Sequence, residues 1–189
     1  MVLPVYAYGH PVLKKICEDI DKDYPELEKL IGNMWDTMYF SKGVGLAGPQ
    51  VGHPIRLFLV DTQQTLNEKD TEKGIKKVFI NAEIIEDGGD LMTYEEGCLS
   101  IPNIHADVIR PEYIVMEYYD ENFQKHTEKF DGINARVIQH EYDHTEGVLF
   151  TELIKPIKRK MVKKKLENIR KGKIVAEYKL KFSPTAKIR

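Results

Sequence analysis

The first clear pattern of apolar positions has the spacing of an amphipathic helix. Between about residues 25 and 41, apolar side chains recur at steps of three and four with polar residues between them. These residues are Leu27, Leu30, Ile31, Met34 and Met38. The spacing therefore predicts a helix with one apolar face.

Three later runs have the character of strands. Residues 55–60 and 78–85 are short apolar runs, and residues 113–119 alternate in part between apolar and polar side chains. The polar stretch 61–77 has no periodicity and is expected to be an exposed loop. Because strands and helices do not alternate regularly, the pattern predicts an α+β fold with antiparallel β-sheets packed around a central helix.

That central helix is predicted between Asp131 or Asn134, which suit a helix start, and Gly147, which suits a stop. Its residues at steps of four, three and four share one face. They are Ile133, Val137, His140 and His144. A polar site on this face would continue into an apolar wall. Arg136 lies beside the wall and is expected at the mouth of a pocket, because a guanidinium is unsuited to a buried apolar surface.

A basic helix is predicted at about 156–171, since Pro156 suits its start and Gly172 its stop. Residues 155–173 contain ten basic side chains and the single acid Glu167. The partial apolar stripe of this helix is Ile157, Met161, Leu166 and Ile169. Two interpretations stay open: a solvated helix docked on the body by that stripe, or an electrostatic contact with RNA.

Composition places these elements in one ordinary domain. The chain has 189 residues, 42% of them hydrophobic and 31% charged, and no Pro/Gly/Ser-rich linker, so one catalytic domain over residues 1–189 is expected. The formal net charge of −2 predicts neither nucleic-acid nor membrane binding by the whole chain. Neither a signal peptide nor a membrane span is visible, and the chain is expected in the cytoplasm.

The strongest chemical motif is the run from His140 to His144, with the sequence His-Glu-Tyr-Asp-His. Residues four apart on a helix lie on the same side, so the two histidines can bind one metal ion together. Glu141 is placed to take a proton from a water held by that ion. The alternative is a chance pair of histidines satisfied by hydrogen bonds. The glutamate and the helical context favour the metal.

The two cysteines, Cys17 and Cys98, are too few for a disulfide framework. Cys17 is expected to be a small buried hydrophobe. Two histidines leave a catalytic metal site one protein ligand short, and Cys98, in a strand-like segment after Gly97, is the candidate for the third. The spacing alone does not decide between this role and an ordinary core cysteine.

A glycine-rich segment, Gly-Val-Gly-Leu-Ala-Gly-Pro-Gln, occupies residues 43–50. It is not a phosphate-binding loop, because it lacks the Gly-Lys-Ser/Thr ending and follows a helix instead of preceding one. Two interpretations remain. The segment is either a plain connector or the backbone wall of an active site, with Gln50 as a side-chain hydrogen-bond donor.

Taken together, residues 43–50, 96–100 and 139–144 resemble, in this order, the three motifs of the peptide deformylases. The resemblance covers roughly residues 5 to 155. Two positions depart from the family pattern. Gly48 replaces the usual alanine and is expected to add backbone freedom, and Thr145 replaces the usual leucine and is expected to weaken a core contact. Neither departure removes a catalytic group.

The resemblance implies a metal-dependent hydrolase that removes the formyl group from the N-terminal formyl-methionine of new polypeptides and releases formate. The implied ligands of one divalent ion per chain are Cys98, His140 and His144, with water in the fourth position. Fe(II) is the usual ion of the family, and Zn, Ni or Co are also found; this donor set suits several of them. Glu141 would act as the base, while the Leu99 N–H and the Gln50 amide would stabilise the developing negative charge.

The resemblance also implies where the peptide lies. The methionine side chain would contact Val44, Gly45, Ile133 and Val137, and extended peptide would pair with residues 43–45 and 101–103. Family analogy favours a ribosome contact through the basic helix. Two rival classes remain: a zinc peptidase, which usually takes its third ligand downstream of the helix, and an inactive metal- or peptide-binding protein.

Overall fold

The computed structural model describes residues 1–66 and 73–184. Within these residues, five strands form an antiparallel sheet in the order β2-β3-β4-β5-β6. The bounds of the strands are β2 Gly45–Ala47, β3 Leu57–Asp61, β4 Lys76–Cys98, β5 Ile101–Tyr119 and β6 Lys125–Asp131. The helices are α1 Leu27–Phe40, α2 Gly132–Thr145 and α3 Pro156–Arg170, with short 3-10 turns at Pro11–Lys14, Gly48–Val51, Gln63–Thr65 and Phe150–Glu152. No helix in this part of the chain is long and apolar enough to cross a membrane.

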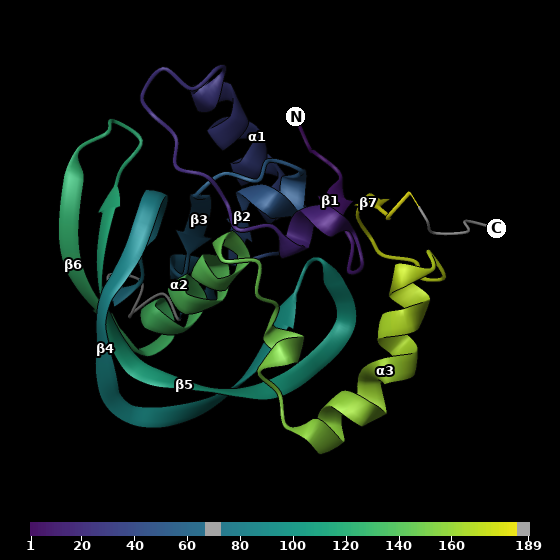
Figure 1. Ribbon diagram of the computed structural model, residues 1–189. Coiled ribbons are helices and arrows are strands. Elements are labelled where there is room, and N and C mark those ends of the chain that lie inside the picture. The colour runs from purple at the N-terminus through teal and green to yellow at the C-terminus, as the bar shows by residue number, and fades with distance from the viewer. Residues whose placement is uncertain (67–72, 185–189) are drawn as a thin grey trace.

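The β4–β5 hairpin gives the molecule its shape. Its register shifts at several points, among them Ile80/Glu83 and Gly88/Leu91. Such bulges bend a strand and increase its twist. The sheet accordingly curls around α2, which lies against its concave face (Figure 1).

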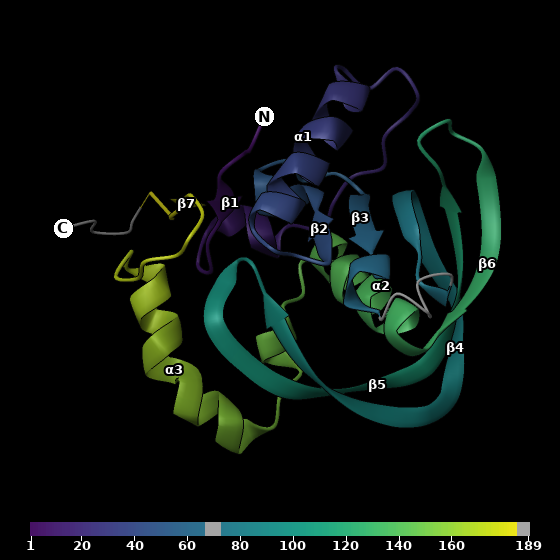
Figure 2. The same ribbon diagram turned by 180° about the vertical axis from the view of Figure 1, so that it is seen from behind.

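Two of the buried clusters that form the core include strands of the sheet, and α2 belongs to one of them. Ala135 and Ile138 pack in one buried cluster with Phe58, Phe79 and Met116 of the sheet. Helix α1 packs its buried methionines in a second cluster against β2 and β3, on the side of the molecule seen in Figure 2. The expected α+β fold, with antiparallel strands around a central helix, is confirmed.

The two ends of the chain meet in a small parallel sheet, an exception to the expected antiparallel pairing. Here β1 Val5–Tyr6 pairs with β7 Leu180–Lys181. Helix α3 docks nearby through half of the predicted stripe: Leu166 and Ile169 are buried as expected, together with Val162. The other two predicted residues, Ile157 and Met161, are each 72% exposed. The buried positions follow one another at steps of four and three, which is regular helix spacing. The predicted stripe instead contains a step of five residues, from Met161 to Leu166, which is not regular helix spacing.

The strand bounds were predicted less well than the helices. The run 78–85 is only the start of β4, and 113–119 is only the end of β5. Most of β4 beyond residue 82 is exposed or half-buried, so it carries no apolar run. Within the stretch expected to be an exposed loop, Asp61 and Thr62 are buried. Residues 67–72 of that stretch lie outside the described residues.

Candidate metal centre and active site

Helix α2 and the end of β4 bring three potential metal ligands together. One donor atom from each of Cys98, His140 and His144 lies within 4.8 Å of the others. The Sγ of Cys98 is 3.3 Å from Nε2 of His144. Sulfur and nitrogen donors about 2.3 and 2.1 Å from one tetrahedral ion would be roughly 3.6 Å apart. The donor set therefore fits a single ion.

The environment of the two histidines suits metal binding. Burial, followed by the nearby charge of His140, lowers the pKa of His144 well below its ordinary value, so its imidazole is neutral. Burial would also lower the pKa of His140, but hydrogen bonds to Cys98 and Glu96 outweigh it and raise this pKa. Binding of an ion would therefore displace a proton from His140.

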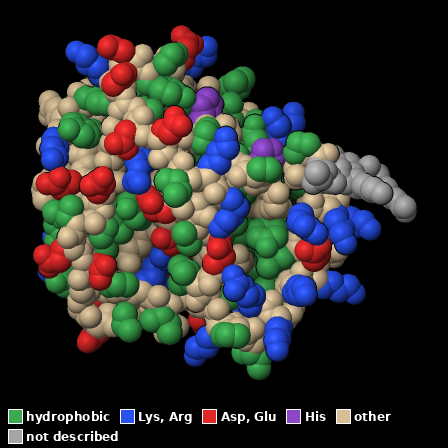
Figure 3. Space-filling view, viewed as in Figure 1, with side chains coloured by type: hydrophobic (Ala, Val, Ile, Leu, Met, Phe, Trp, Pro, Cys, Tyr) green, Lys and Arg blue, Asp and Glu red, His purple; other side chains and the backbone are tan. Residues whose placement is uncertain are grey.

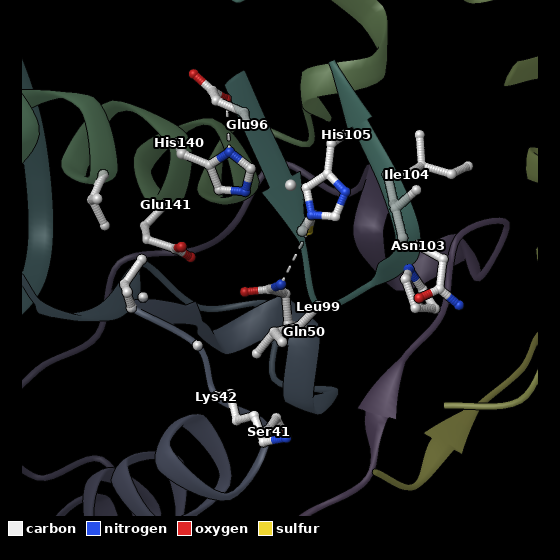
Figure 4. A pocket seen from close by; sticks show the side chains of 18 of the residues that line it. Ser41, Lys42, Gln50, Glu96, Leu99, Asn103, Ile104, His105, His140 and Glu141 are labelled. Carbon is white, nitrogen blue, oxygen red and sulfur yellow. Dashed lines mark hydrogen bonds and ion pairs between the residues drawn. The ribbon is translucent and has the colours of Figure 1, made fainter. Parts of the chain in front are cut away.

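Glu96 orients His140 from behind. Its Oε2 is 2.9 Å from the Nδ1 of His140 (Figure 4), which leaves Nε2 for an ion. Arg110 donates to both oxygens of Glu96, at 2.7 and 3.0 Å, and also donates to Asp143 at 2.7 Å. Burial would raise the pKa of Glu96, but the bonds from His140 and Arg110 outweigh it and hold this pKa well below its usual range. Glu96 is therefore a buried anion.

Arg136 belongs to the same network. It is 7% exposed and donates to Glu96 at 3.0 Å and to the carbonyl oxygens of Val108 and Met92 at 3.2 and 2.6 Å. Arg136 borders the cavity, as expected. The reason given for that expectation was wrong, because the guanidinium is buried and its charge is satisfied by these bonds. Sequence reasoning gave Glu96 no role, although it lies only two residues before Cys98.

Glu141 points into the cavity with one carboxylate oxygen unpaired. The residue is 4% exposed, and its Oε2 has no hydrogen-bond partner in the described part of the chain. Burial raises the pKa of Glu141 to about 7. A general base works best when its pKa is near the operating pH. The carboxylate is thus placed to accept a proton near neutrality.

Gly45 makes room for that carboxylate. A Cβ atom at Gly45 would lie 2.7 Å from Cδ of Glu141 and would overlap its Oε1. Gly45 is therefore explained by the close approach of the Glu141 carboxylate, and not by a backbone conformation that only glycine adopts.

The variant Gly45→Ala is expected to fold and retain metal but to lose at least about 10-fold in kcat, because the added methyl displaces the carboxylate. A misplacement of about 1 Å can cost roughly 10²-fold in rate. Gly32→Ala is the matched control, since nothing lies within 4 Å of a Cβ at Gly32. Wild-type kcat in Gly45→Ala would show that the position of Glu141 is not critical.

Gln50 approaches the site from the opposite wall. Its Oε1 accepts a hydrogen bond from the Ala47 N–H at 2.8 Å. Its Nε2 is consequently turned towards Cys98 Sγ at 3.4 Å and Ser100 Oγ at 3.3 Å. Leu99 follows Cys98 in the turn between β4 and β5. Both residues expected to stabilise negative charge therefore lie beside Cys98.

These groups border one cavity of about 860 Å³, within the range of roughly 300–1,000 Å³ that is common for ligand sites. The sequence-predicted residues that line it are Val44, Gly45, Gln50, Cys98, Leu99, Ile133, Val137, His140 and Glu141. His144 is 1% exposed and does not line the cavity. The cavity also has a wall that the sequence did not predict, formed by Val175, Ala176, Glu177 and Tyr178.

The remaining sequence expectations concern residues away from the donors. Cys17 is buried, as expected. A Cβ at Gly48 would lie 2.8 Å from the carbonyl oxygen of His53, so the glycine permits close packing. Its φ is outside the left-handed region, so the expected backbone freedom is not used here. Thr145 is 1% exposed, and its hydroxyl donates to the Tyr142 carbonyl at 2.7 Å. Its polar group is therefore satisfied inside the core.

A three-donor centre beside a buried carboxylate and an apolar cavity is the arrangement of a metal-dependent hydrolase. The family model of polypeptide deformylase matches residues 2–160. The chain belongs to this family.

Individual relatives agree over nearly the whole length. The peptide deformylase of Christiangramia forsetii is 53% identical over 196 residues, with 100% of both chains covered. That of Flavobacterium psychrophilum is 52% identical, covering 97% of this chain and 98% of its own. A plant peptide deformylase structure has a TM-score of 0.82 at 32% identity, with 90% of each chain covered. One from Legionella pneumophila has a TM-score of 0.78 at 33% identity, with 89% of this chain and 95% of its own covered.

Proposed function

We propose that this peptide deformylase removes the formyl group of an N-terminal formyl-methionine with the residues around the cavity, acting as one catalytic domain over residues 1–189. Cys98, His140 and His144 would hold one divalent ion. The observation that carries the proposal is the buried carboxylate of Glu141, one oxygen of which is unpaired, on a residue that lines the same cavity as Cys98 and His140. A bound ion would supply Lewis-acid chemistry, lowering the pKa of water and polarising the formyl carbonyl.

The protein groups then have distinct roles. Glu141 takes the proton of the attacking water and returns it to the peptide nitrogen, which leaves poorly unless it is protonated. The Gln50 amide and the Leu99 N–H donate to the formyl oxygen as negative charge develops. Loss of one such donor typically costs ~10²–10³ in turnover.

The apolar part of the cavity receives the methionine side chain. Val44, Gly45, Ile133 and Val137 line it, and residues 43–45 and 101–103 border it where extended peptide would pair. Burial of the thioether side chain against this wall would place the formyl group between Glu141 and Gln50.

Formate release from a formyl-Met peptide, measured beside cleavage of the same peptide without the formyl group, tests the proposal. Formate release alone supports it. Cleavage of a peptide bond in the unformylated peptide would indicate a zinc peptidase. If fully metal-loaded protein catalysed neither reaction, the chain would be a binding protein.

Fe(II) is the proposed ion in the cell, with Zn, Ni or Co as alternatives that the same donors accept. An Fe(II) ion bound to a thiolate is open to oxidation, and Cys98 can be oxidised once the ion is disturbed. Protein loaded anaerobically with Fe(II) is therefore expected to lose activity on exposure to air, while the nickel form retains it. Equal lifetimes of the two forms would contradict the oxidation argument.

The proposed partners are formyl-methionyl nascent peptides in the cytoplasm and, through α3, the ribosome. Lys and Arg side chains gather over α3 (Figure 3), and Val162, Leu166 and Ile169 fix its other face to the body. This arrangement supports an electrostatic contact with ribosomal RNA. The variant with Lys160, Lys163 and Lys164 changed to Gln is expected to co-sediment less with ribosomes and to show a weaker salt dependence. Unchanged co-sedimentation would remove the helix from the contact.

A further inference from the structure

The segment after α3 forms one wall of the active-site cavity. The chain turns at Gly172, which has a φ of 70°, and returns along the body so that β7 lies beside β1 (Figures 1 and 2). We call residues 173–181 the C-terminal strap. Four strap residues, 175–178, line the same cavity as Cys98 and Glu141. The match to the family model ends at residue 160, so this wall lies outside the matched part of the chain.

The strap is held at its far end by regular backbone pairing. The Val5 N–H donates to the Lys179 carbonyl, and the Ala7 N–H to the Lys181 carbonyl, each at 2.9 Å. Ile174 and Leu180 pack against the buried cluster that also contains α3. These contacts make the strap a fixed wall of the cavity.

Tyr178 ties the strap to the catalytic turn. Its hydroxyl donates to the Leu99 carbonyl at 2.7 Å. The neighbouring strap residue, Glu177, is consequently held at a defined place on the cavity rim.

Glu177 pairs across the rim with Lys42, at the end of α1. The Lys42 Nζ is 2.7 Å from Glu177 Oε2, and the side chains are 78% and 81% exposed. Both residues line the cavity. Lys42 directly precedes residues 43–45, beside which the substrate backbone is proposed to lie. Charged substrate side chains beyond the methionine would therefore meet this exposed pair.

We propose that Glu177 and Lys42 set the charge preference for the residues that follow the formylated methionine. Glu177 attracts a basic substrate side chain and Lys42 an acidic one, so in the wild-type protein the two charges largely offset each other. The inference rests on the deformylase function and deepens it, because it assigns a specificity role to a residue of the C-terminal strap.

The test compares kcat/KM for formyl-Met-Lys, formyl-Met-Glu and formyl-Met-Ala peptides in three proteins. Glu177→Gln is expected to raise the ratio of kcat/KM for the Glu peptide to that for the Lys peptide by about 1.4- to fivefold, the range of exposed charge pairs. Lys42→Gln is expected to lower it by a similar factor. Both shifts should shrink at about 1 M salt, where the screening length is roughly 3 Å. Formyl-Met-Ala should change little in either variant.

Lys179→Gln is the matched control, because this exposed lysine lies in the strap but not in the cavity lining. Equal effects on all three peptides, shifts in the same direction for both variants, or a shift as large in Lys179→Gln would overturn the strap proposal. Absence of formate release by the wild-type protein would instead refute the proposed function, so the two failures are distinguishable.

Discussion

Glu141→Gln is expected to bind its metal ion normally and to lose nearly all turnover. The amide has the size of the carboxylate but cannot accept a proton from water. General acid–base catalysis typically contributes about 10²–10⁴ in rate, and a fall of that size in kcat is expected. Metal content by elemental analysis and the rate of formate release, measured on the same preparation, check both parts of this result.

The control for this substitution is Glu117→Gln. Glu117 pairs with Lys125 on the sheet, with Nζ 2.9 Å from Oε2, and is absent from the cavity lining. The Glu117→Gln variant should therefore have the kcat of the wild type. If Glu141→Gln kept more than a small fraction of the wild-type rate, the proton would have to pass through another group, and the unpaired oxygen of Glu141 would have no catalytic meaning.

The helices could be predicted because their buried positions repeat within the sequence. The observed α1, Leu27–Phe40, differs by only a residue or two at each end from the predicted 25–41. For α3 the bounds were also right, yet only two of the four predicted stripe residues, Leu166 and Ile169, are buried. Local spacing sets where a helix forms, whereas the partner surface decides which side is buried.

The hairpin was predicted poorly for a related reason. Strand β5 does alternate between buried and exposed positions, but two of its inward residues are Ala106 and Arg110. A small side chain and a charged one at inward positions do not produce the alternation of large apolar and polar residues by which a strand is predicted. Arg110 is buried because Glu96 and Asp143 neutralise it, and that pairing joins segments far apart in the sequence.

The site shows the same division between local and long-range information. The His140 to His144 motif is local, so its ligand pair and its base could be proposed from spacing. Cys98 needed the family resemblance, because the approach of β4 to α2 depends on the fold. The strap wall was not predicted at all, since nothing local links residues 175–178 to Cys98.

Cys98→Ala is expected to lose most of its bound metal. Each of the three donors supplies one protein bond to the ion, and structural and catalytic centres of this kind rarely hold an ion on two. Zinc or nickel added to the purified apoprotein should reach about one ion per chain in the wild type and far less in the variant. The same loss is expected for His140→Ala and His144→Ala.

Cys17→Ala separates this loss from a general effect of removing a thiol. Cys17 is buried, and burial raises its pKa to about 11, so it carries no thiolate near neutrality. That variant should keep full metal content. Full occupancy in Cys98→Ala would show that the third ligand lies elsewhere and would bring back the peptidase interpretation, in which an acid downstream of α2 completes the site. Two acids downstream of α2 illustrate what that would require: Glu152 pairs with Lys14 at 2.6 Å and does not line the cavity. Glu177 does line it, but pairs with Lys42 at 2.7 Å on the exposed rim, so it would have to leave that pair to reach the donors.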